Sequence, residues 1–136
     1  MNTEKYERFR QRYQNFQKAV DLLEKQCQRK DLEDENIAAT LHFYEVAFEI
    51  SWKLLKDNLE IHGLPVKSPR EAIKTAFSME HIDDGALWIE MLDARNSISH
   101  MYKEDMAREL FVNIKDKYLN ALIKLCSTLG EVECVD

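Results

Sequence analysis

Apolar residues recur along the chain at alternating spacings of three and four, the period of one face of an α-helix. The first series predicts a helix over about residues 4–29 and consists of Tyr6, Phe9, Tyr13, Phe16, Val20, Leu23 and Cys27. The second consists of Ile37, Leu41, Tyr44, Phe48, Trp52, Leu55 and Leu59. It follows a charged break at residues 30–35 and is stopped by Gly63. We expect these two long helices to pair antiparallel across the acidic loop.

Three further helices are predicted in the second half of the chain. Ser68, Pro69 and Glu71 supply an N-cap, a first-turn proline and the acid of a capping box, which predicts a short helix through about Met79. Asp83 or Asp84 can cap a fourth helix. This helix contains Leu87, Trp88, Met91, Leu92, Arg95 and Ile98, and it ends near His100. A fifth helix starts at about Glu104 and has Gly130 near its end. One of its faces consists of Ala107, Phe111, Ile114, Tyr118, Ala121 and Leu125.

These lengths and loops predict an all-α fold. The 136 residues include only three Gly and two Pro, and no strand-type alternation or internal repeat is visible. One domain over residues 1–136 accommodates a single hydrophobic core. We expect a four-helix up-and-down bundle with one extra short helix, in which Trp52 and Trp88 are core residues.

Composition and charge narrow the function. A net charge of -6 argues against coating nucleic acids, because phosphate binding needs a clustered positive field, although a local basic cleft stays compatible. The apolar stretches are shorter than the roughly 20 residues that span a bilayer, so no membrane segment is predicted. The N-terminal sequence lacks the apolar core of a secretory signal. These features predict a cytoplasmic protein.

Metal and cofactor chemistry is not indicated. Cys27, Cys126 and Cys134 form neither a disulfide framework nor a zinc-finger pattern. The histidines outside the segment discussed next are scattered singly, and we interpret His42, His62 and His81 as surface or helix-end residues. The acids of residues 31–35 have no phosphate loop beside them, so a solvated turn is the simpler interpretation. A nucleotidyltransferase catalytic subunit is excluded, because the Gly-Ser loop and the magnesium-binding acids that it needs are missing.

The segment from Arg95 to Tyr102 stands out. It has the pattern Arg-x-x-x-x-His-x-Tyr with His100 in the middle, and its chance occurrence in a chain with seven Arg, four His and five Tyr is roughly 0.008. On a regular helix Arg95 and His100 are about 140° apart, whereas Arg95 and Tyr102 are about 20° apart. Either the helix therefore ends or bends near Ser99, or a two-fold axis brings a second copy alongside to complete the site.

The same segment resembles the signature of HEPN-superfamily proteins that are encoded beside minimal nucleotidyltransferases. Two other segments are similar to the branch called nucleotidyltransferase substrate-binding proteins: Ser68 to Glu71 leading to Ala76 and Phe77, and Trp88 with Met91 and Leu92 before Arg95. The similarity spans about residues 40–120. It implies a homodimeric bundle of four or five helices, with the Arg and His of both protomers lining one cleft.

The resemblance also implies roles for individual residues. In the metal-independent ribonucleases of the superfamily, an imidazole such as His100 moves the proton and a guanidinium such as Arg95 holds the phosphate. Asn96 either orients the site or caps the helix end. Tyr102 is implied as the acceptor of AMP from the nucleotidyltransferase, or it is an amphipathic residue at a helix junction. The plain structural alternative is that Arg95 pairs with Asp93, Glu90 or an acid on another helix while His100 merely ends its helix.

These observations favour a binding and regulatory protein. We expect the partner subunit of a minimal nucleotidyltransferase, as one half of a toxin and antitoxin pair, with no cofactor or metal of its own. The enzyme alternative is a metal-independent endoribonuclease that uses Arg95 and His100 on RNA. A purely structural bundle is the third alternative.

Overall fold

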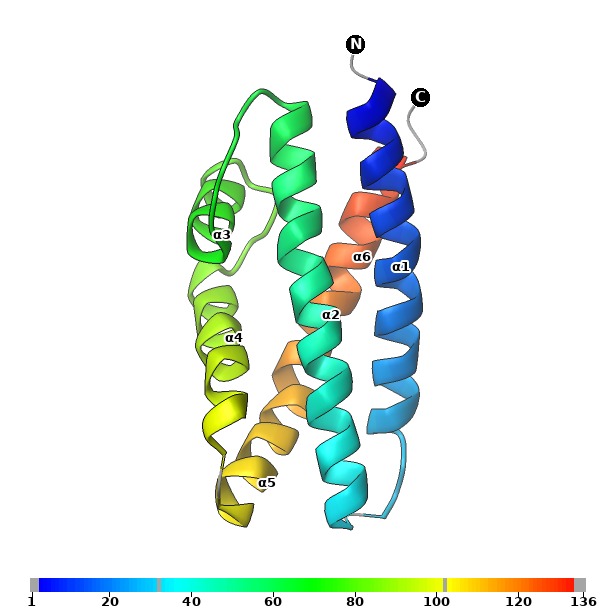
Figure 1. Ribbon diagram of the computed structural model, residues 1–136, viewed down its shortest axis with the longest axis vertical. Coiled ribbons are helices and arrows are strands. Elements are labelled where there is room, and N and C mark those ends of the chain that lie inside the picture. The colour runs from blue at the N-terminus through cyan, green and yellow to red at the C-terminus, as the bar shows by residue number, and fades with distance from the viewer. Residues whose placement is uncertain (1–2, 32, 102, 134–136) are drawn as a thin grey trace.

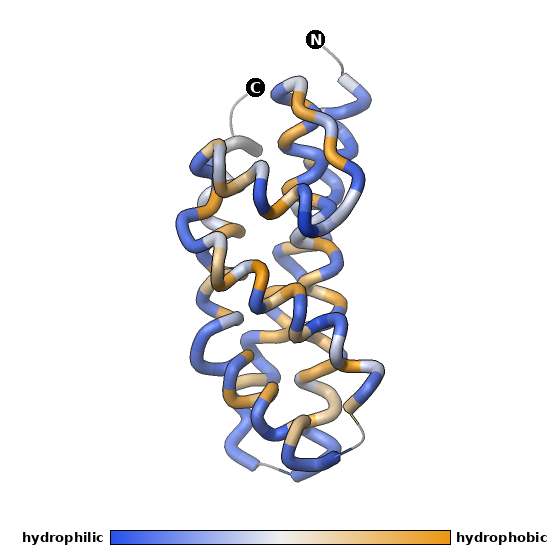
Figure 2. The backbone as a smooth tube through the Cα atoms, turned by 90° about the vertical axis from the view of Figure 1, so that its left-hand side faces the viewer, coloured by the Kyte–Doolittle hydropathy of each residue, from blue (hydrophilic) through white to orange (hydrophobic). Residues whose placement is uncertain are grey.

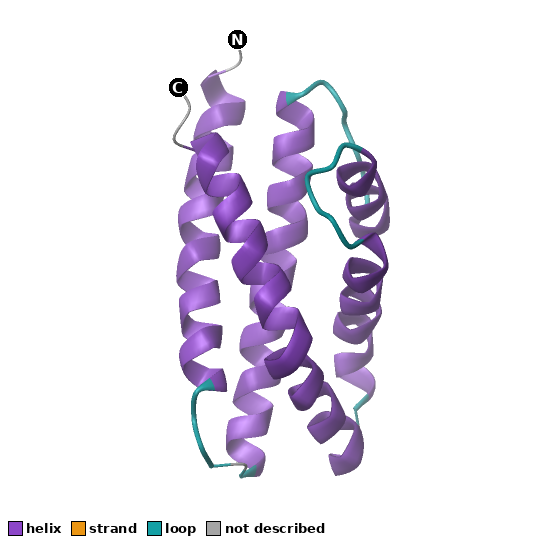
Figure 3. Cartoon of the chain, turned by 180° about the vertical axis from the view of Figure 1, so that it is seen from behind, coloured by secondary structure: helices purple, strands orange, loops and turns teal. Residues whose placement is uncertain are grey.

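The computed structural model describes residues 3–31, 33–101 and 103–133, and these form helices and connecting loops without strands (Figure 3). The α-helices are α1 (Thr3–Cys27), α2 (Asp34–Ile61), α3 (Pro69–Ser78), α4 (Gly85–Ser97), α5 (Glu104–Asn113) and α6 (Leu119–Glu133). A 3₁₀ turn, η1 (Ile98–His100), extends α4, and a π-helical turn, η2 (Ile114–Tyr118), joins α5 to α6 into one continuous helix. The all-α prediction and its five helices are confirmed.

Helices α1 and α2 lie antiparallel and side by side, as the two apolar series predict (Figure 1). Between them Nη1 of Arg12 lies 2.8 Å from Oδ2 of Asp57. Asp57 is only 4% exposed, and its burial raises the pKa of its carboxyl although Arg12 opposes the rise. An ion pair this deep aligns the two helices, because loss of either partner would leave a buried charge uncompensated.

A glycine lets α6 cross close to α1. The hydroxyl of Tyr13 donates to the carbonyl oxygen of Cys126 over 2.8 Å. A Cβ added at Gly130 would lie 2.5 Å from that hydroxyl, so any larger residue at this position would push the two helices apart. Gly130 lies near the end of the last helix, as predicted, and α6 continues past it to Glu133.

Helix α2 is the centre of the molecule and contacts α1, α3, α4, α5 and α6. Along each helix hydrophobic and hydrophilic positions alternate with the helical period (Figure 2). The largest buried aromatic residues are Phe9, Tyr13, Phe16, Tyr44, Phe48, Trp88 and Tyr118. Each contributes about 1.5–3 kcal/mol through burial, so the aromatic content of the chain is used mainly for the core. Trp88 is a core residue as predicted, whereas Trp52 packs at the edge of the core and is partly buried.

Helices α3 and α4 follow one another along the side of α2 opposite α1 (Figure 1). The hydroxyl of Ser68 caps α3 by accepting from the backbone N–H of Glu71. In return the Glu71 carboxylate accepts from the backbone N–H of Lys67, one residue before the cap, whereas in the usual capping box it accepts from the cap residue itself. Asp84 rather than Asp83 caps α4, because its carboxylate accepts from the backbone N of Leu87. Asp83 instead pairs with Lys124 on α6.

Glu80 ends α3 in a conformation that favours glycine. Its φ is 63°, and its neighbour His81 donates its backbone N–H to the carbonyl of Ala76 over 2.8 Å, which closes a Schellman-type C-terminus. A side chain in the left-handed region costs roughly 1–2 kcal/mol. Glu80 therefore occupies a strained backbone position between α3 and α4.

We expect Glu80→Gly to raise the free energy of unfolding by about 1 kcal/mol, because glycine adopts this φ without the steric cost. For a chain of this size that corresponds to a rise in melting temperature of about 4 °C, measurable by thermal denaturation followed by circular dichroism. Glu80→Ala is the control for loss of the carboxylate alone and should gain much less. Gly63→Ala should destabilise the protein, since Gly63 has φ 78° with open space around it. Equal melting temperatures for the glycine and alanine variants of Glu80 would show that the left-handed backbone at this position is not strained.

Candidate functional site

The packing of α4 decides where the predicted site residues lie. Trp88, Met91 and Leu92 are buried and hold one face of α4 against the core. Arg95 follows one turn after Met91 and Leu92, so it comes to the boundary between α4 and α2. The ladder of α-helical bonds ends at Ser97, whose hydroxyl donates to the carbonyl of Ala94 over 2.7 Å. Of the two arrangements expected near Ser99, the end of the regular helix is therefore present within the single chain.

Arg95 is held against α2 and is not free. Its Nη2 lies 2.9 Å from Oε2 of Glu49, and its guanidinium carbon lies 5.9 Å from the ring centre of Phe48. The Arg95 side chain is 23% exposed, and its Nε is buried without a hydrogen-bond partner in the described part of the chain. Part of the guanidinium thus still has donor capacity, while the carboxylate of Glu49 offsets its charge.

The acids nearest to Arg95 in sequence are engaged elsewhere. Asp93 accepts from Nη2 of Arg70 on α3 over 3.2 Å. Glu90 accepts from Nζ of Lys117 over 2.8 Å and from the hydroxyl of Tyr118 over 2.7 Å. The hydrogen bond from Lys117 is the main reason why the pKa of Glu90 lies below its usual value. Of the alternatives that the sequence left open for Arg95, the acid on another helix is the one that the structure contains.

Two tyrosines of the core hold this part of α4 in place. The rings of Tyr44 and Tyr118 stack with their centres 5.5 Å apart, and the hydroxyl of Tyr44 donates to the carbonyl of Met91 over 2.7 Å. Burial is the main cause of the raised pKa of both phenols, so they remain protonated donors over the physiological range. Through hydrogen bonds to the carbonyl of Met91 and to the carboxylate of Glu90 they help to fix α4.

His100 lies at the end of η1 and is exposed. Its imidazole makes no hydrogen bond or ion pair with the residues that the structure describes, so both ring nitrogens are available to a ligand. Asn96 is likewise exposed on α4 and caps no helix end through its side chain. Tyr102 lies outside the described residues. No hydrogen bond joins Arg95 to His100, so one chain does not complete the paired site that the motif implies.

A groove of about 520 Å³ opens beside His100. Ile98 and Met101, which flank His100 in the sequence, line one side of it, and the first half of α2 and the start of α5 line the other. The cations on its rim are Lys103 and Arg108. Nη2 of Arg108 is already paired with Asp34 over 3.2 Å and with Glu104 over 3.0 Å, which leaves Lys103 as the exposed cation nearest to His100 in sequence. The groove can accept an extended ligand, but the carboxylates of Asp34, Glu45 and Glu104 outnumber its two cations, so its lining is not basic.

The described residues contain neither a cluster of metal ligands nor a helix that could cross a membrane. Within them no group of three or more His, Cys, Asp or Glu side chains is arranged to hold a metal ion. None of the helices there combines the length and the apolarity that crossing a bilayer requires. Cys27 and Cys126 are free thiols whose pKa is raised chiefly by burial, which makes them poor nucleophiles. Cys134 lies outside the described residues.

An all-helical chain with an exposed imidazole after an Arg on the same helix has the architecture expected for a HEPN protein. Comparison with family models matches residues 11–131 to "Nucleotidyltransferase substrate binding protein like". The match covers well over half of the chain, and the protein belongs to this family. The resemblance to the HEPN superfamily and its nucleotidyltransferase substrate-binding branch is thereby confirmed.

The proteins that are similar to this chain include a curated relative and a solved structure. "Probable ribonuclease HepT" from Haemophilus influenzae is 24% identical over 90 residues, which is 62% of this chain and 62% of the relative, so the chain spans less than two thirds of that protein. The crystal structure of a protein from Thermus thermophilus superposes with a TM-score of 0.73 at 26% identity, and covers 88% of this chain and 98% of its own. The second comparison supports the helical fold over most of the chain.

Sequence reasoning did not find the contact between Glu49 and Arg95. Glu49 lies between apolar residues of α2, and its proximity to Arg95 depends on the relative register of α2 and α4. No spacing within one helix encodes that register. The place of His81 in the wall of a cavity was missed for the same reason.

Proposed function

We propose that this chain is the HEPN-type partner subunit of a minimal nucleotidyltransferase. The observation that carries the proposal is the match of residues 11–131 to a family whose name describes the binding of a nucleotidyltransferase substrate. The proposal places the pair in the cytoplasm, where ATP is available, as two halves of a toxin and antitoxin system. The chain contributes the binding surface, and the partner contributes the nucleotide and metal chemistry.

Co-expression with a nucleotidyltransferase encoded beside its gene tests this function. With an affinity tag on the nucleotidyltransferase only, the 16.1 kDa chain should co-purify in a fixed ratio, and native mass spectrometry should give the composition of the complex. Elution of the two proteins as separate species at micromolar concentration would refute the partnership.

The proposal includes a homodimer of an up-and-down bundle whose four arms are α1, α2, the α3–α4 pair and the α5–α6 pair. Support comes from an apolar stripe on α2 beside Glu49, formed by Phe43, Val46 and Ile50. Phe43 and Ile50 are partly buried against the core, and Val46 is 40% exposed, so the stripe has apolar surface that a second copy could cover. A second copy on this stripe would bring two Arg95 side chains close to one two-fold axis.

Light scattering after gel filtration should therefore give about twice the chain mass of 16.1 kDa. Val46→Lys should shift the protein to the monomer mass, because an ammonium group on the stripe would be desolvated in the dimer. Val112→Lys is the matched control, since Val112 is 50% exposed on α5 and away from the stripe. A monomeric wild-type chain, or equal effects of the two variants, would remove the shared-cleft arrangement.

A second candidate function is a metal-independent endoribonuclease. It is favoured by the name of the Haemophilus influenzae relative and by the exposed, unengaged imidazole of His100. In this function His100 removes the proton from the 2′-hydroxyl, the 2′-oxygen attacks phosphorus, and the bond to the 5′-oxygen breaks, with the leaving 5′-oxygen taking a proton from water. Arg95 stabilises the charge on the phosphate, and Asn96 orients the substrate.

The ion pair between Glu49 and Arg95 affects RNA binding in this candidate function. We expect Glu49→Gln to tighten binding of a single-stranded RNA by about fivefold, since a competing charge-assisted hydrogen bond of about 1 kcal/mol is removed. The measurement is fluorescence anisotropy in a His100→Ala background, which prevents cleavage. Glu45→Gln, one turn earlier on α2, controls for the general loss of negative charge. Weaker binding in the Glu49 variant would mean that Glu49 orients Arg95 and does not compete with phosphate.

The nucleotidyltransferase partner regulates the site in this proposal by attaching AMP to Tyr102. The support is the position of Tyr102 two residues after His100 in the matched motif. An AMP group adds bulk and negative charge next to the residues that would hold RNA phosphate. The modified chain would then be inactive.

A further inference from the structure

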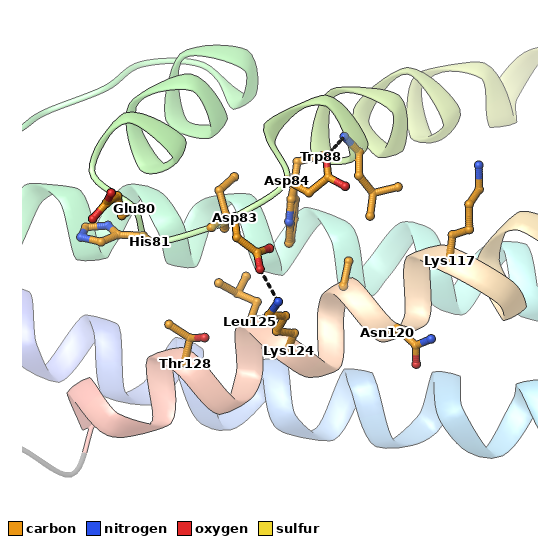
Figure 4. Close-up of a pocket in the computed structure, with 13 residues that line it drawn as sticks. Glu80, His81, Asp83, Asp84, Trp88, Lys117, Asn120, Lys124, Leu125 and Thr128 are labelled. Carbon is orange, nitrogen blue, oxygen red and sulfur yellow. Dashed lines mark hydrogen bonds and ion pairs between the residues drawn. The ribbon is translucent and has the colours of Figure 1, made fainter.

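A cavity of about 560 Å³ lies away from Arg95 and His100, between the α3–α4 loop and the face of η2 and α6 (Figure 4). Its apolar wall is made by Ile82, Leu87, Trp88 and Leu125. Trp88 and Leu125 are almost completely buried and belong to the core, so this wall is rigid. The volume matches that of pockets which enclose small organic molecules.

The cations of the cavity are already neutralised. Nζ of Lys124 is paired with Asp83 across the cavity, as the dashed line in Figure 4 marks. Nζ of Lys117 is paired with Glu90, which lies outside the lining residues. Neither ammonium group is therefore available to an anionic ligand without breaking an existing ion pair.

Acidic side chains outnumber basic side chains in the lining of the cavity. Three carboxylates line it, those of Glu80, Asp83 and Asp84, against the two ammonium groups. Glu80 is exposed and has no ion pair or hydrogen bond with the described residues through its carboxylate. Figure 4 shows it at one end of the cavity, beside the ring of His81. The strained left-handed backbone of Glu80 places this carboxylate on the rim.

His81 adds polarity at this end without adding charge. Burial, and next the neighbouring His62, lower the pKa of His81, so its imidazole is neutral at physiological pH. Behind it Nδ2 of Asn58 lies 3.3 Å from Nδ1 of His81. Asn58 is only 1% exposed, and its Oδ1 has no partner among the described residues. Asn58 is not among the residues that line the cavity, so it positions the imidazole of His81 and does not itself face a ligand.

We propose that this cavity binds a small organic amine, with its ammonium group at the Glu80 end and its hydrocarbon part against Ile82, Trp88 and Leu125. The argument is charge complementarity, because the lining carries excess negative charge and its own cations are paired. A metal ion is the poorer occupant, because no group of three or more His, Cys, Asp or Glu side chains among the described residues is arranged to hold one. The proposal does not depend on the proposed function.

The probe is 2-phenylethylamine, compared with 2-phenylethanol and phenylacetate, which have the same ring with a neutral or an anionic end. Isothermal titration calorimetry should give saturable binding of the amine in about the millimolar range or tighter, and at least about tenfold weaker binding of the alcohol and the acid. In ¹H–¹⁵N spectra the indole N–H signal of Trp88 should shift, whereas that of Trp52, outside the cavity, should not. Trp52→Phe assigns the two signals.

Glu80→Gly should weaken binding of the amine at least about tenfold while the protein stays folded, because glycine suits the backbone at this position. Glu7→Gln removes one negative charge from the exposed part of α1 and should leave the affinity unchanged. Phenylacetate binding as tightly as the amine, an unshifted Trp88 signal, or unaltered affinity in the Glu80 variant would each overturn the proposal.

Discussion

Alanine at His100 or at Arg95 is expected to reduce cleavage of RNA by this chain at least about a hundredfold, if the ribonuclease function holds. Loss of a general acid-base group typically costs a factor of about 10² to 10⁴, and loss of a charge-stabilising donor costs about as much. His100 carries no structural interaction in the described chain, so its replacement should leave the fold intact. Arg95 also pairs with Glu49, so its variant needs a separate check of stability.

Arg95→Lys supplies that check. Lysine keeps the charge and can still reach Glu49, but it lacks the fork of donors that matches two phosphate oxygens. We expect Arg95→Lys to retain the melting temperature and to lose most of the cleavage. His42→Ala is the matched control for His100, because His42 is an exposed histidine on α2 that lies outside the motif.

The products give an independent test of the mechanism. Cleavage should persist in EDTA and leave a 2′,3′-cyclic phosphate, since the 2′-oxygen is the nucleophile and the described residues offer no metal site. The assay is mass spectrometry of the fragments of a defined oligonucleotide. Inhibition by EDTA, or full activity of the His100 or Arg95 variant, would exclude the assigned roles.

The helices could be predicted from the sequence because their signals are local. The periodic apolar residues define one face of each helix, and Ser68 places a cap that depends on neighbouring residues only. The choice between Asp83 and Asp84 as the cap of α4 could not be made, since it depends on Lys124, which is distant in the sequence and binds Asp83. The ends of the elements were therefore less certain than their existence.

The π-helical turn η2 was also missed. A π-turn inserts one residue into the helix, and the apolar positions around it still fit a period close to that of an α-helix. The insertion aligns Tyr118 with its two tertiary partners, Tyr44 and Glu90. Contacts between distant segments, and not the local pattern, determine this irregularity.

The candidate site was predictable as a motif but not as a geometry. The spacing of Arg95 and His100 identified the segment, and the structure adds that Arg95 is bound to Glu49 while His100 is exposed. A motif specifies which residue types are near each other in the chain. It contains no information about the opposing helix, which in this protein sets the charge that Arg95 presents to a ligand.

The second large effect concerns Tyr102. Incubation of the chain with its nucleotidyltransferase, ATP and magnesium should add one or more AMP units, a mass increase readily resolved on a 16.1 kDa chain. The phenol oxygen attacks the α-phosphorus of ATP, a bond to phosphorus forms, and pyrophosphate leaves with its electron pair. The partner supplies the magnesium and the base that removes the phenol proton, because a nearby helix C-terminus does not stabilise a phenolate.

Tyr102→Phe should abolish the addition, because only the hydroxyl oxygen is removed while the ring is kept. Tyr6→Phe is the control, since Tyr6 is a partly exposed tyrosine on α1 and far from the motif in the sequence. Helicity and dimer mass should be the same in both variants, which separates loss of the acceptor from loss of the fold. An unmodified wild-type chain in the presence of an active partner, or equal modification of the Tyr102 variant, would exclude the acceptor role. Binding of the nucleotidyltransferase without covalent chemistry would then be the better account, because the family match does not depend on Tyr102.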